Sequence, residues 1–360
     1  MGSLTNENPY ATLFWDALAQ AKAQRASDIH IQPDREGVTI RFRINGELVP
    51  WKRIGLVHKP VFLQEAKRLS QCSLAQSGRA QDARISVAEL RLDVRVNLIP
   101  SIDGEKLVLR LLDQSRTFDL PSMNLGDEAT VAIRRALSNG TGVCLMTGPT
   151  GSGKTTLLYS ALAELDRSCL NIVAIEDPVE YAFSGITQVQ VSPKLGFADA
   201  LRAMLRQDPD VILVGEVRDR ETADLCFQAA ATGHLVLSTL HANSASDVPG
   251  RLRGLGIRED QVNSGLRFAS AQRLVGRLCL QCRVAVTEKE RHDFFEPART
   301  PLWKRNPGGC VECQRGLSGR LPVFEYVEPG SAWKSVGLRE TIHGLVESGV
   351  VDAYETLLVA

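Results

Sequence analysis

The sequence predicts an α/β protein that combines a larger parallel-sheet domain with a smaller N-terminal α+β domain. Residues 28–113 contain short runs of alternating apolar and polar residues, whereas residues 127–243 alternate apolar strands with helical segments. Repeated β–α alternation with fully apolar strands is typical of a mostly parallel sheet covered by helices. Two cysteine pairs then interrupt this rhythm and indicate a separate metal-binding module.

The expected N-terminal domain spans residues 1–113. Its predicted elements are a helix at 11–26, strands at 28–33, 38–44 and 47–51, a helix at 60–70, and strands at 84–100 and 105–113. Asn45–Gly46 separates two of these strands, and Asn-Gly in that position is the strongest short signal for a hairpin. Residues 114–126 contain Pro121 and little periodicity, so we expect a linker there.

The expected second domain spans residues 127–360. Its predicted strands GVCLMTG, NIVAIED, VILVGE and HLVLSTLH alternate with helices that begin at Lys154 and lie near 197–207 and 220–231. The cysteine module occupies about 276–325, and the last 35 residues are weakly patterned and indicate no function.

Composition argues against some classes of protein. Lys plus Arg and Asp plus Glu both number 42, so the net charge is zero, whereas a nucleic-acid-binding domain usually carries a basic excess. No run of 18 apolar residues is present, and the N-terminus MGSLTNENPY lacks the features of a secretory signal. We therefore expect a cytoplasmic protein that reaches a membrane only through partners.

The stretch GPTGSGKT at 148–155 matches the phosphate-binding P-loop pattern and lies between a predicted strand and a predicted helix. Glycines allow backbone N–H groups to curl around phosphate, and the helix N-terminus adds partial positive charge. We expect Lys154 to reach the β- and γ-phosphates of bound ATP or GTP, and Thr155 to bind Mg²⁺. The predicted nucleotide-binding residues are Gly148, Pro149, Thr150, Gly151, Ser152, Gly153, Lys154, Thr155 and Thr156.

Acidic residues end two of the predicted strands. NIVAI is followed by Glu176 and Asp177, and VILVG is followed by Glu216. Ligands of open α/β sheets bind at the carboxyl ends of the strands, so these carboxylates are expected near the P-loop. A magnesium–nucleotide site needs an acid near the metal and a group that orients or deprotonates water. Simple loop acids are the alternative interpretation.

A third strand, HLVLSTLH, ends in His241. This side chain is a candidate for sensing the γ-phosphate. In the alternative interpretation, His241 merely caps the strand by hydrogen bonding.

Cys279 and Cys282 form one C-x-x-C pair, and Cys310 and Cys313 form another. Two such pairs are a strong signal for tetrahedral Zn²⁺, and four sulfur ligands leave no open position, so the metal would be structural. A redox-active C-x-x-C is the alternative. The isolated cysteines are expected to be small buried residues; they are Cys72, Cys144, Cys169 and Cys226.

These motifs together resemble the secretion ATPases of the type II secretion and type IV pilus assembly family. The matching segments are GPTGSGKTT, IEDPVEY, LRQDPDVILVGEVRDRETADL, TGHLVLSTLHAN, AQRLVGRLC and GC-x-x-C with SGR, and upstream ASDIHIQP and VTIRFRINGEL. The resemblance covers roughly residues 11–330. It implies a RecA-like P-loop domain, a PAS-like N-terminal domain and a zinc-binding tetracysteine module, which is typical of assembly motors rather than retraction motors.

The resemblance further implies a homo-hexameric motor that hydrolyses ATP and acts through an inner-membrane platform protein. Glu216 would polarise water, and Glu176 and Asp177 would lie near Mg²⁺. Arg84 and Arg95 of the smaller domain match the family's phosphate-contacting arginines, and Arg218 is a further charge sensor.

Departures from the family pattern concern docking more than catalysis. From the resemblance we expect the chain to begin almost directly with the second N-terminal domain of its relatives, and Gln32 and Ala83 stand where relatives commonly have Glu and Gly. A nucleic-acid-translocating or conjugation-type hexameric ATPase is the alternative function, although no nucleic acid is expected from the neutral charge. A nucleotide-dependent scaffold without turnover is a third reading.

Overall fold

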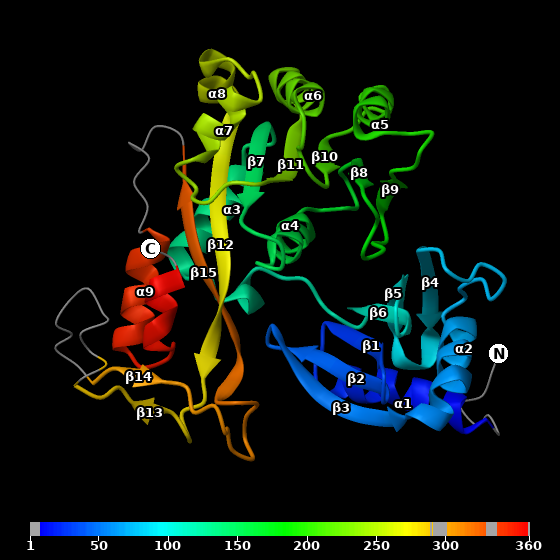
Figure 1. Ribbon diagram of the computed structural model, residues 1–360. Coiled ribbons are helices and arrows are strands. Elements are labelled where there is room, and N and C mark those ends of the chain that lie inside the picture. Colours follow the sequence, from blue (N-terminus) through cyan, green and yellow to red (C-terminus); the bar gives the residue numbers. More distant parts are fainter. Residues whose placement is uncertain (1–7, 289, 291–300, 329–336, 359–360) are drawn as a thin grey trace. The chain divides into compact units, whose positions relative to one another are not determined.

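The computed structural model describes residues 8–288, 290, 301–328 and 337–358, and it divides into two compact units, Met1–Thr117 and Phe118–Ala360 (Figure 1). The division falls inside the stretch 114–126 that lacks periodicity in the sequence. Among the described helices of both units, none has the length and apolarity needed to cross a bilayer.

The first unit is a six-stranded antiparallel sheet with the strand order β3-β2-β1-β6-β5-β4. Its elements are α1 (Pro9–Ala23), β1 (Asp28–Asp34), β2 (Gly37–Ile44), β3 (Glu47–Gly55), η1 (Leu56–His58), α2 (Lys59–Leu69), β4 (Gln81–Val87), η2 (Ala88–Leu90), β5 (Leu92–Ser101) and β6 (Gly104–Asp113). Asn45 and Gly46 both have positive φ, at 51° and 89°, which confirms the predicted two-residue hairpin between β2 and β3.

The sheet of the first unit has one apolar face and one polar face. Ile29 and Ile31 of β1 are buried among the apolar residues of α1, such as Phe14 and Leu18. Among the alternate positions of β1, His30, Gln32 and Asp34 are polar and less buried. Period-2 alternation therefore sets which side chains enter the core and which form the opposite face.

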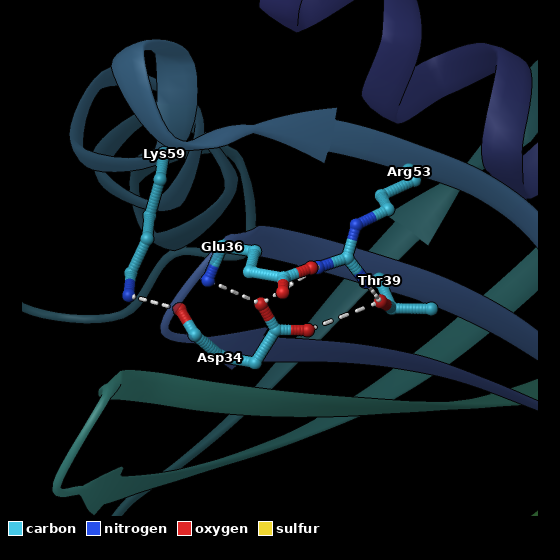
Figure 2. Close-up of polar contacts among 5 residues, drawn as sticks. All are labelled: Asp34, Glu36, Thr39, Arg53 and Lys59. Carbon is cyan, nitrogen blue, oxygen red and sulfur yellow. Dashed lines mark hydrogen bonds and ion pairs between the residues drawn. The ribbon is translucent and has the colours of Figure 1, made fainter.

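A polar network ties the turn between β1 and β2 to β3 and α2 (Figure 2). Asp34 Oδ1 accepts hydrogen bonds from the Glu36 N–H at 2.9 Å and from Arg53 Nη2 at 3.0 Å. Arg53 also donates to Glu36 Oε2 at 3.0 Å and to Thr39 Oγ1 at 2.9 Å, and Lys59 Nζ donates to the Asp34 carbonyl at 2.6 Å. Arg53 and the Asp34 carboxylate thus link residues of β1, β2 and β3, and the Asp34 carbonyl links β1 to the start of α2.

The Asp34→Asn substitution is expected to remove part of the acid dependence of stability. The Glu36 N–H bond and the Arg53 charge lower the pKa of Asp34 below its ordinary value of 3.8. A depressed carboxyl pKa stabilises the folded chain above the unfolded-state value, and this contribution disappears as pH falls through the folded-state value. Thermal unfolding midpoints of wild type and D34N should therefore differ at pH 6 and converge below pH 3.8. The exposed Asp16 of α1 offers a control, and an equal convergence with D16N would contradict the assignment.

The second unit is a seven-stranded sheet with the order β15-β12-β7-β11-β10-β8-β9, parallel except for the β12–β15 pair. Its elements are η3 (Pro121–Met123), α3 (Asp127–Ser138), β7 (Gly142–Thr147), α4 (Lys154–Ala163), β8 (Ile172–Glu176), β9 (Ile186–Gln190), α5 (Phe197–Met204), β10 (Val211–Val214), α6 (Arg220–Ala231), β11 (Leu235–Leu240), α7 (Val248–Gly254), α8 (Glu259–Gly265), β12 (Leu266–Leu278), β13 (Val284–Ala285), β14 (Trp303–Lys304), β15 (Leu317–Val327), α9 (Leu338–Glu347) and η5 (Ala353–Leu358).

Apolar cores cover both faces of this sheet. β10 and β11 are buried along their whole lengths, as expected for central strands of a parallel sheet. Successive residues of β10 enter different cores, because Ile212 packs with α5 and α6 whereas Leu213 packs with α3 and α4. The predicted mixed α/β fold with a parallel sheet is confirmed.

A long antiparallel ribbon at the edge of the sheet carries the cysteine module. β12 leads directly into Cys279, and β15 begins shortly after Cys313. α9 follows β15 in the chain. It lies in the C-terminal stretch that is weakly patterned in sequence, and it contributes Leu338 and Ile342 to the core. The module is therefore anchored in the main sheet at both of its ends.

Candidate functional site

The P-loop needs glycine at three positions for steric reasons. Gly148, Gly151 and Gly153 all have positive φ, at 140°, 78° and 93°. A Cβ atom at Gly148 would lie 2.4 Å from the Gln272 carbonyl oxygen, and one at Gly153 would lie 2.6 Å from Gln272 Nε2. Glycine is favoured at all three positions by the positive φ, and at Gly148 and Gly153 also by these close neighbours, whereas Gly151 faces open space. The loop connects the end of β7 to the start of α4, as the motif requires.

Lys154 begins α4 and folds back over the loop. Its Nζ donates to the carbonyl oxygens of Gly148 at 2.7 Å and Pro149 at 3.0 Å. Burial lowers the pKa of the Lys154 ammonium, while Glu216 opposes that shift and Arg273 adds to it. Glu216 and Arg273 are therefore close enough to act on the Lys154 ammonium electrostatically. Phosphate oxygens of a bound nucleotide would compete with the two carbonyls for this ammonium.

Side-chain hydroxyls lock the neighbouring strand ends together. β10 pairs with β8 on one side and with β11 on the other. Thr239 Oγ1 donates to the Gly215 carbonyl at 2.7 Å, and Ser238 Oγ donates to the Val214 carbonyl at 2.6 Å. The Gly215 N–H donates to the Ile175 carbonyl at 2.7 Å. The ends of β8, β10 and β11, which are adjacent in the sheet, therefore lie close together at its carboxyl edge.

Glu216 is the centre of a polar cluster at this edge. Its Oε1 lies 2.9 Å from His241 Nε2, and its Oε2 accepts a hydrogen bond of 2.9 Å from Arg218 Nε. Arg218 Nη1 lies 3.7 Å from Asp177 Oδ2. The Glu216 side chain is 19% exposed, whereas those of His241 and Arg218 are more than half exposed. Residues from β8, β10 and β11 ends are thus brought together.

A surface hollow joins this cluster to the P-loop. The residues that line it are Gly148, Pro149, His241, Ala242, Asn243, Asp247, Gly250 and Arg251. His241 therefore contributes to the wall of the same hollow as the first residues of the loop, and at the same time contacts Glu216.

Glu176 points away from the cluster, although Asp177 beside it belongs there. The Glu176 carboxylate is buried and accepts hydrogen bonds from the Tyr159 hydroxyl of α4 and, at 3.0 Å, from Gln188 Nε2 of β9. Burial and the Glu176 carboxylate raise the pKa of Tyr159 well above its ordinary value. Tyr159 and Phe118 belong to a cluster of aromatic rings behind the P-loop helix. No sequence signal singled out Tyr159 or Gln188.

The arginines of the first unit form a row across the polar face of its sheet. Arg84 pairs in register with Arg95, and Arg95 pairs with Arg110. Arg84 Nη2 lies 2.7 Å from Asp93 Oδ2, and Arg110 Nε lies 3.1 Å from Asp28 Oδ1. Sequence reasoning overlooked Arg110, which continues the row but is visible only once the strand register is known.

The four paired cysteines converge. The Sγ atoms of Cys279 and Cys310 are 3.7 Å apart, those of Cys282 and Cys313 are 3.6 Å apart, and all ligand atoms lie within 4.8 Å of one another. A tetrahedral site with Zn–S bonds of about 2.3 Å requires S–S separations of roughly 3.8 Å. The closest contacts run between the two pairs as well as within one, which fits a shared metal ion better than two redox-active pairs.

The parallel sheet, the glycine loop and the strand-end carboxylate beside it define a P-loop nucleotide hydrolase. The sequence model of the Type II/IV secretion system protein family matches residues 3–348. The chain belongs to this family, and it is an ATPase of the secretion and pilus class.

Two relatives illustrate the range of the family. The chain is 39% identical to the type II secretion system ATPase E of Vibrio cholerae serotype O1 over 350 residues, covering 94% of this chain and 68% of the relative. It is 38% identical to the type IV pilus assembly ATPase PilB of Acinetobacter baylyi over 338 residues, covering 90% of this chain and 58% of PilB. Both relatives are longer than the region that they share with this chain.

A solved structure supports the assignment of the chain to this family of ATPases. The crystal structure of the pilus retraction motor PilT with bound ADP matches with a TM-score of 0.67 and 25% identity, and 96% of each chain is covered. The match extends over both units of the chain.

Proposed function

We propose that the protein is a hexameric ATPase motor that drives assembly of a type IV pilus or a type II secretion pseudopilus through an inner-membrane platform protein. The observation that carries this proposal is the Glu216 cluster, in which His241, Arg218 and Asp177 gather beside the P-loop. Family membership supplies the biological setting, and the cluster supplies the means of hydrolysis.

ATP would lie with its phosphates on residues 148–156. Backbone N–H groups at the start of α4 and the Lys154 ammonium would stabilise the phosphate charge. Thr155 and Asp177 would hold Mg²⁺ through oxygen atoms, and the bound ion would neutralise charge on the phosphates. We favour Asp177 over Glu176 for this role because Tyr159 and Gln188 already occupy both Glu176 oxygens.

Glu216 would orient and polarise the water that attacks the γ-phosphate. In the structure its two oxygens contact His241 and Arg218. A γ-phosphate would attract the exposed Arg218 guanidinium, whose planar fork suits phosphate oxygens. Movement of Arg218 toward the phosphate would release Glu216 Oε2 for the water while His241 keeps the carboxylate oriented. Arg218 would thereby couple nucleotide occupancy to activation of the base.

The arginine row of the first unit would complete the site. Arg84, Arg95 and Arg110 lie on one polar face, and arginine is the residue type expected to stabilise charge on a transferring phosphoryl group. Closure of the first unit of the same or a neighbouring subunit on ATP would bring this face to the phosphates, and product release would reopen it. Such closure commonly limits turnover.

The proposal includes the finer class of each unit. The parallel sheet with the P-loop supports a RecA-like assignment for the second unit, and the antiparallel sheet with α1 and α2 supports a PAS-like assignment for the first. The tetracysteine cluster would hold a structural Zn²⁺. We propose a cytoplasmic location at the inner membrane, reached through the platform protein.

Assembly and stimulation of ATP hydrolysis test this function. With ATP analogue, the purified protein should have about six times the 39.4 kDa mass of the chain. ATP turnover should rise when the cytoplasmic domain of the platform protein is added, and Lys154→Ala should abolish both basal and stimulated turnover. Stimulation by single-stranded DNA but not by the platform domain would instead favour the nucleic-acid motor.

A further inference from the structure

The loop that carries His241 is held from both strands of the edge ribbon. This histidine loop (residues 241–245) follows β11. Arg273 of β12 donates from Nη2 to the Asn243 carbonyl at 2.9 Å. Glu325 of β15 accepts a hydrogen bond from the Ala245 N–H through Oε1. The two contacts reach the loop within two residues of each other.

Glu325 joins more than the loop. Its Oε2 accepts a hydrogen bond of 2.9 Å from the Leu338 N–H at the start of α9. The residue is 7% exposed, and Ala245 is fully buried. A buried carboxylate is destabilising unless hydrogen bonds compensate for its desolvation. The Ala245 and Leu338 N–H groups supply these hydrogen bonds to Glu325. The first-turn N–H of a helix is also a favourable partner for negative charge.

The same ribbon forms the floor of the P-loop. Arg273 Nη1 lies 3.2 Å from the Gln272 carbonyl, the atom that excludes a Cβ at Gly148. Within the described part of the chain, Arg273 forms no salt bridge, and its acceptors are the two main-chain carbonyls. Its guanidinium therefore bridges the strand under the P-loop to the histidine loop.

We propose that Glu325 and Arg273 are positioning residues that hold the histidine loop on the β12–β15 ribbon and thereby keep His241 against Glu216. The proposal rests on the catalytic role proposed above for the Glu216–His241 pair. Neither residue contacts Glu216 itself, so both act through the loop. Because catalysis is sensitive to displacements of about 1 Å, a loosened loop would impair turnover before it impairs nucleotide binding.

The test compares Glu325→Gln, Arg273→Met and His241→Ala with the double variant E325Q/H241A. E325Q keeps the size of the side chain but replaces one acceptor oxygen with an NH2 group, which can only donate hydrogen bonds. We expect kcat, and likewise the rate constant of ATP hydrolysis measured in a single turnover, to fall about ten- to hundredfold in E325Q and R273M. KM for ATP and the affinity for a fluorescent ATP analogue should change by no more than about twofold. Arg277→Met, in β12, and Glu328→Gln, just after the end of β15, lie away from the histidine loop and should retain wild-type kcat.

The double variant distinguishes positioning from general destabilisation. If Glu325 acts through His241, E325Q/H241A should be no slower than H241A, whereas independent losses would multiply. Multiplying losses, or normal kcat in E325Q and R273M beside an impaired H241A, would overturn the positioning role alone. Normal kcat in H241A would overturn the role of His241 and, with it, the positioning role of Glu325 and Arg273. If E325Q does not fold, R273M and R273M/H241A decide the question by the same criteria.

Discussion

Replacement of Glu216 by Gln is expected to lower single-turnover ATP hydrolysis by at least about hundredfold, the contribution typical of a positioned general base. Glutamine preserves the length of the side chain, but its amide cannot polarise water as a carboxylate does. Its amide nitrogen also cannot accept a hydrogen bond from Arg218 or His241, the partners of the two Glu216 oxygens. Affinity for ATP should stay within a few-fold of wild type, because Lys154 and the P-loop remain.

Asp219→Asn provides the matched control for Glu216→Gln. Asp219 lies three positions further along the same loop, but its Oδ1 caps α6 by accepting the Thr222 N–H at 2.8 Å. Asparagine caps helices about as well as aspartate, so turnover in D219N should be near normal. Near-normal hydrolysis in E216Q, or an equal loss in D219N, would show that Glu216 is not the group that activates water.

The sequence predicted the parts of the site that depend on local pattern. The P-loop between strand and helix, and the placement of Glu216 and His241 at strand ends, follow from apolar periodicity and from the rule that parallel strands share a carboxyl edge. The structure brings Glu216 and His241 within 2.9 Å of each other. This convergence needed no long-range information beyond the order of the strands.

Side-chain direction could not be predicted for adjacent residues. Glu176 and Asp177 follow the same strand, yet Glu176 turns inward to Tyr159 and Gln188 while Asp177 reaches Arg218. The direction of Glu176 is decided by partners on α4 and β9, which the strand's own sequence does not reveal. The Tyr159 and Gln188 donors stabilise the Glu176 carboxylate in its buried position. Tertiary packing therefore gives Glu176 and Asp177 different environments, although the sequence motif does not distinguish them.

Long-range partners explain the remaining omissions. Glu325 contacts Ala245, a residue 80 positions away, and the weakly patterned stretch that contains Leu338 forms a helix over this contact. The alignment of Arg110 with Arg95 depends on strand register, which alternation alone does not specify. These features belong to tertiary pairing and not to local sequence.

Removal of metal from the tetracysteine module is expected to destabilise the ribbon end of the second unit. Without a cation, four sulfur atoms within 4.8 Å of one another cannot all remain thiolates, so they would take up protons and lose the metal–sulfur bonds that hold the two cysteine pairs together. Structural zinc binding contributes on the order of 10 kcal/mol of apparent folding free energy in small domains. Freshly purified protein should contain about one zinc ion per chain. Chelation, or Cys310→Ser, should release that zinc and lower the thermal unfolding midpoint of the module.

Cys169→Ser separates the module from cysteine chemistry in general. Cys169 is an exposed free cysteine outside the cluster, so the prediction that it is buried is wrong. This variant should keep both the zinc content and the unfolding midpoint. Because β12 continues from the floor of the P-loop into Cys279, and Cys279 N–H donates to the Gly316 carbonyl just before β15, loss of metal should fray the ribbon from its far end. Hydrogen exchange should then increase first in residues 279–283 and 310–317 and only later near Gln272. Metal-free protein with an unchanged midpoint and unchanged exchange there would rule out a structural metal.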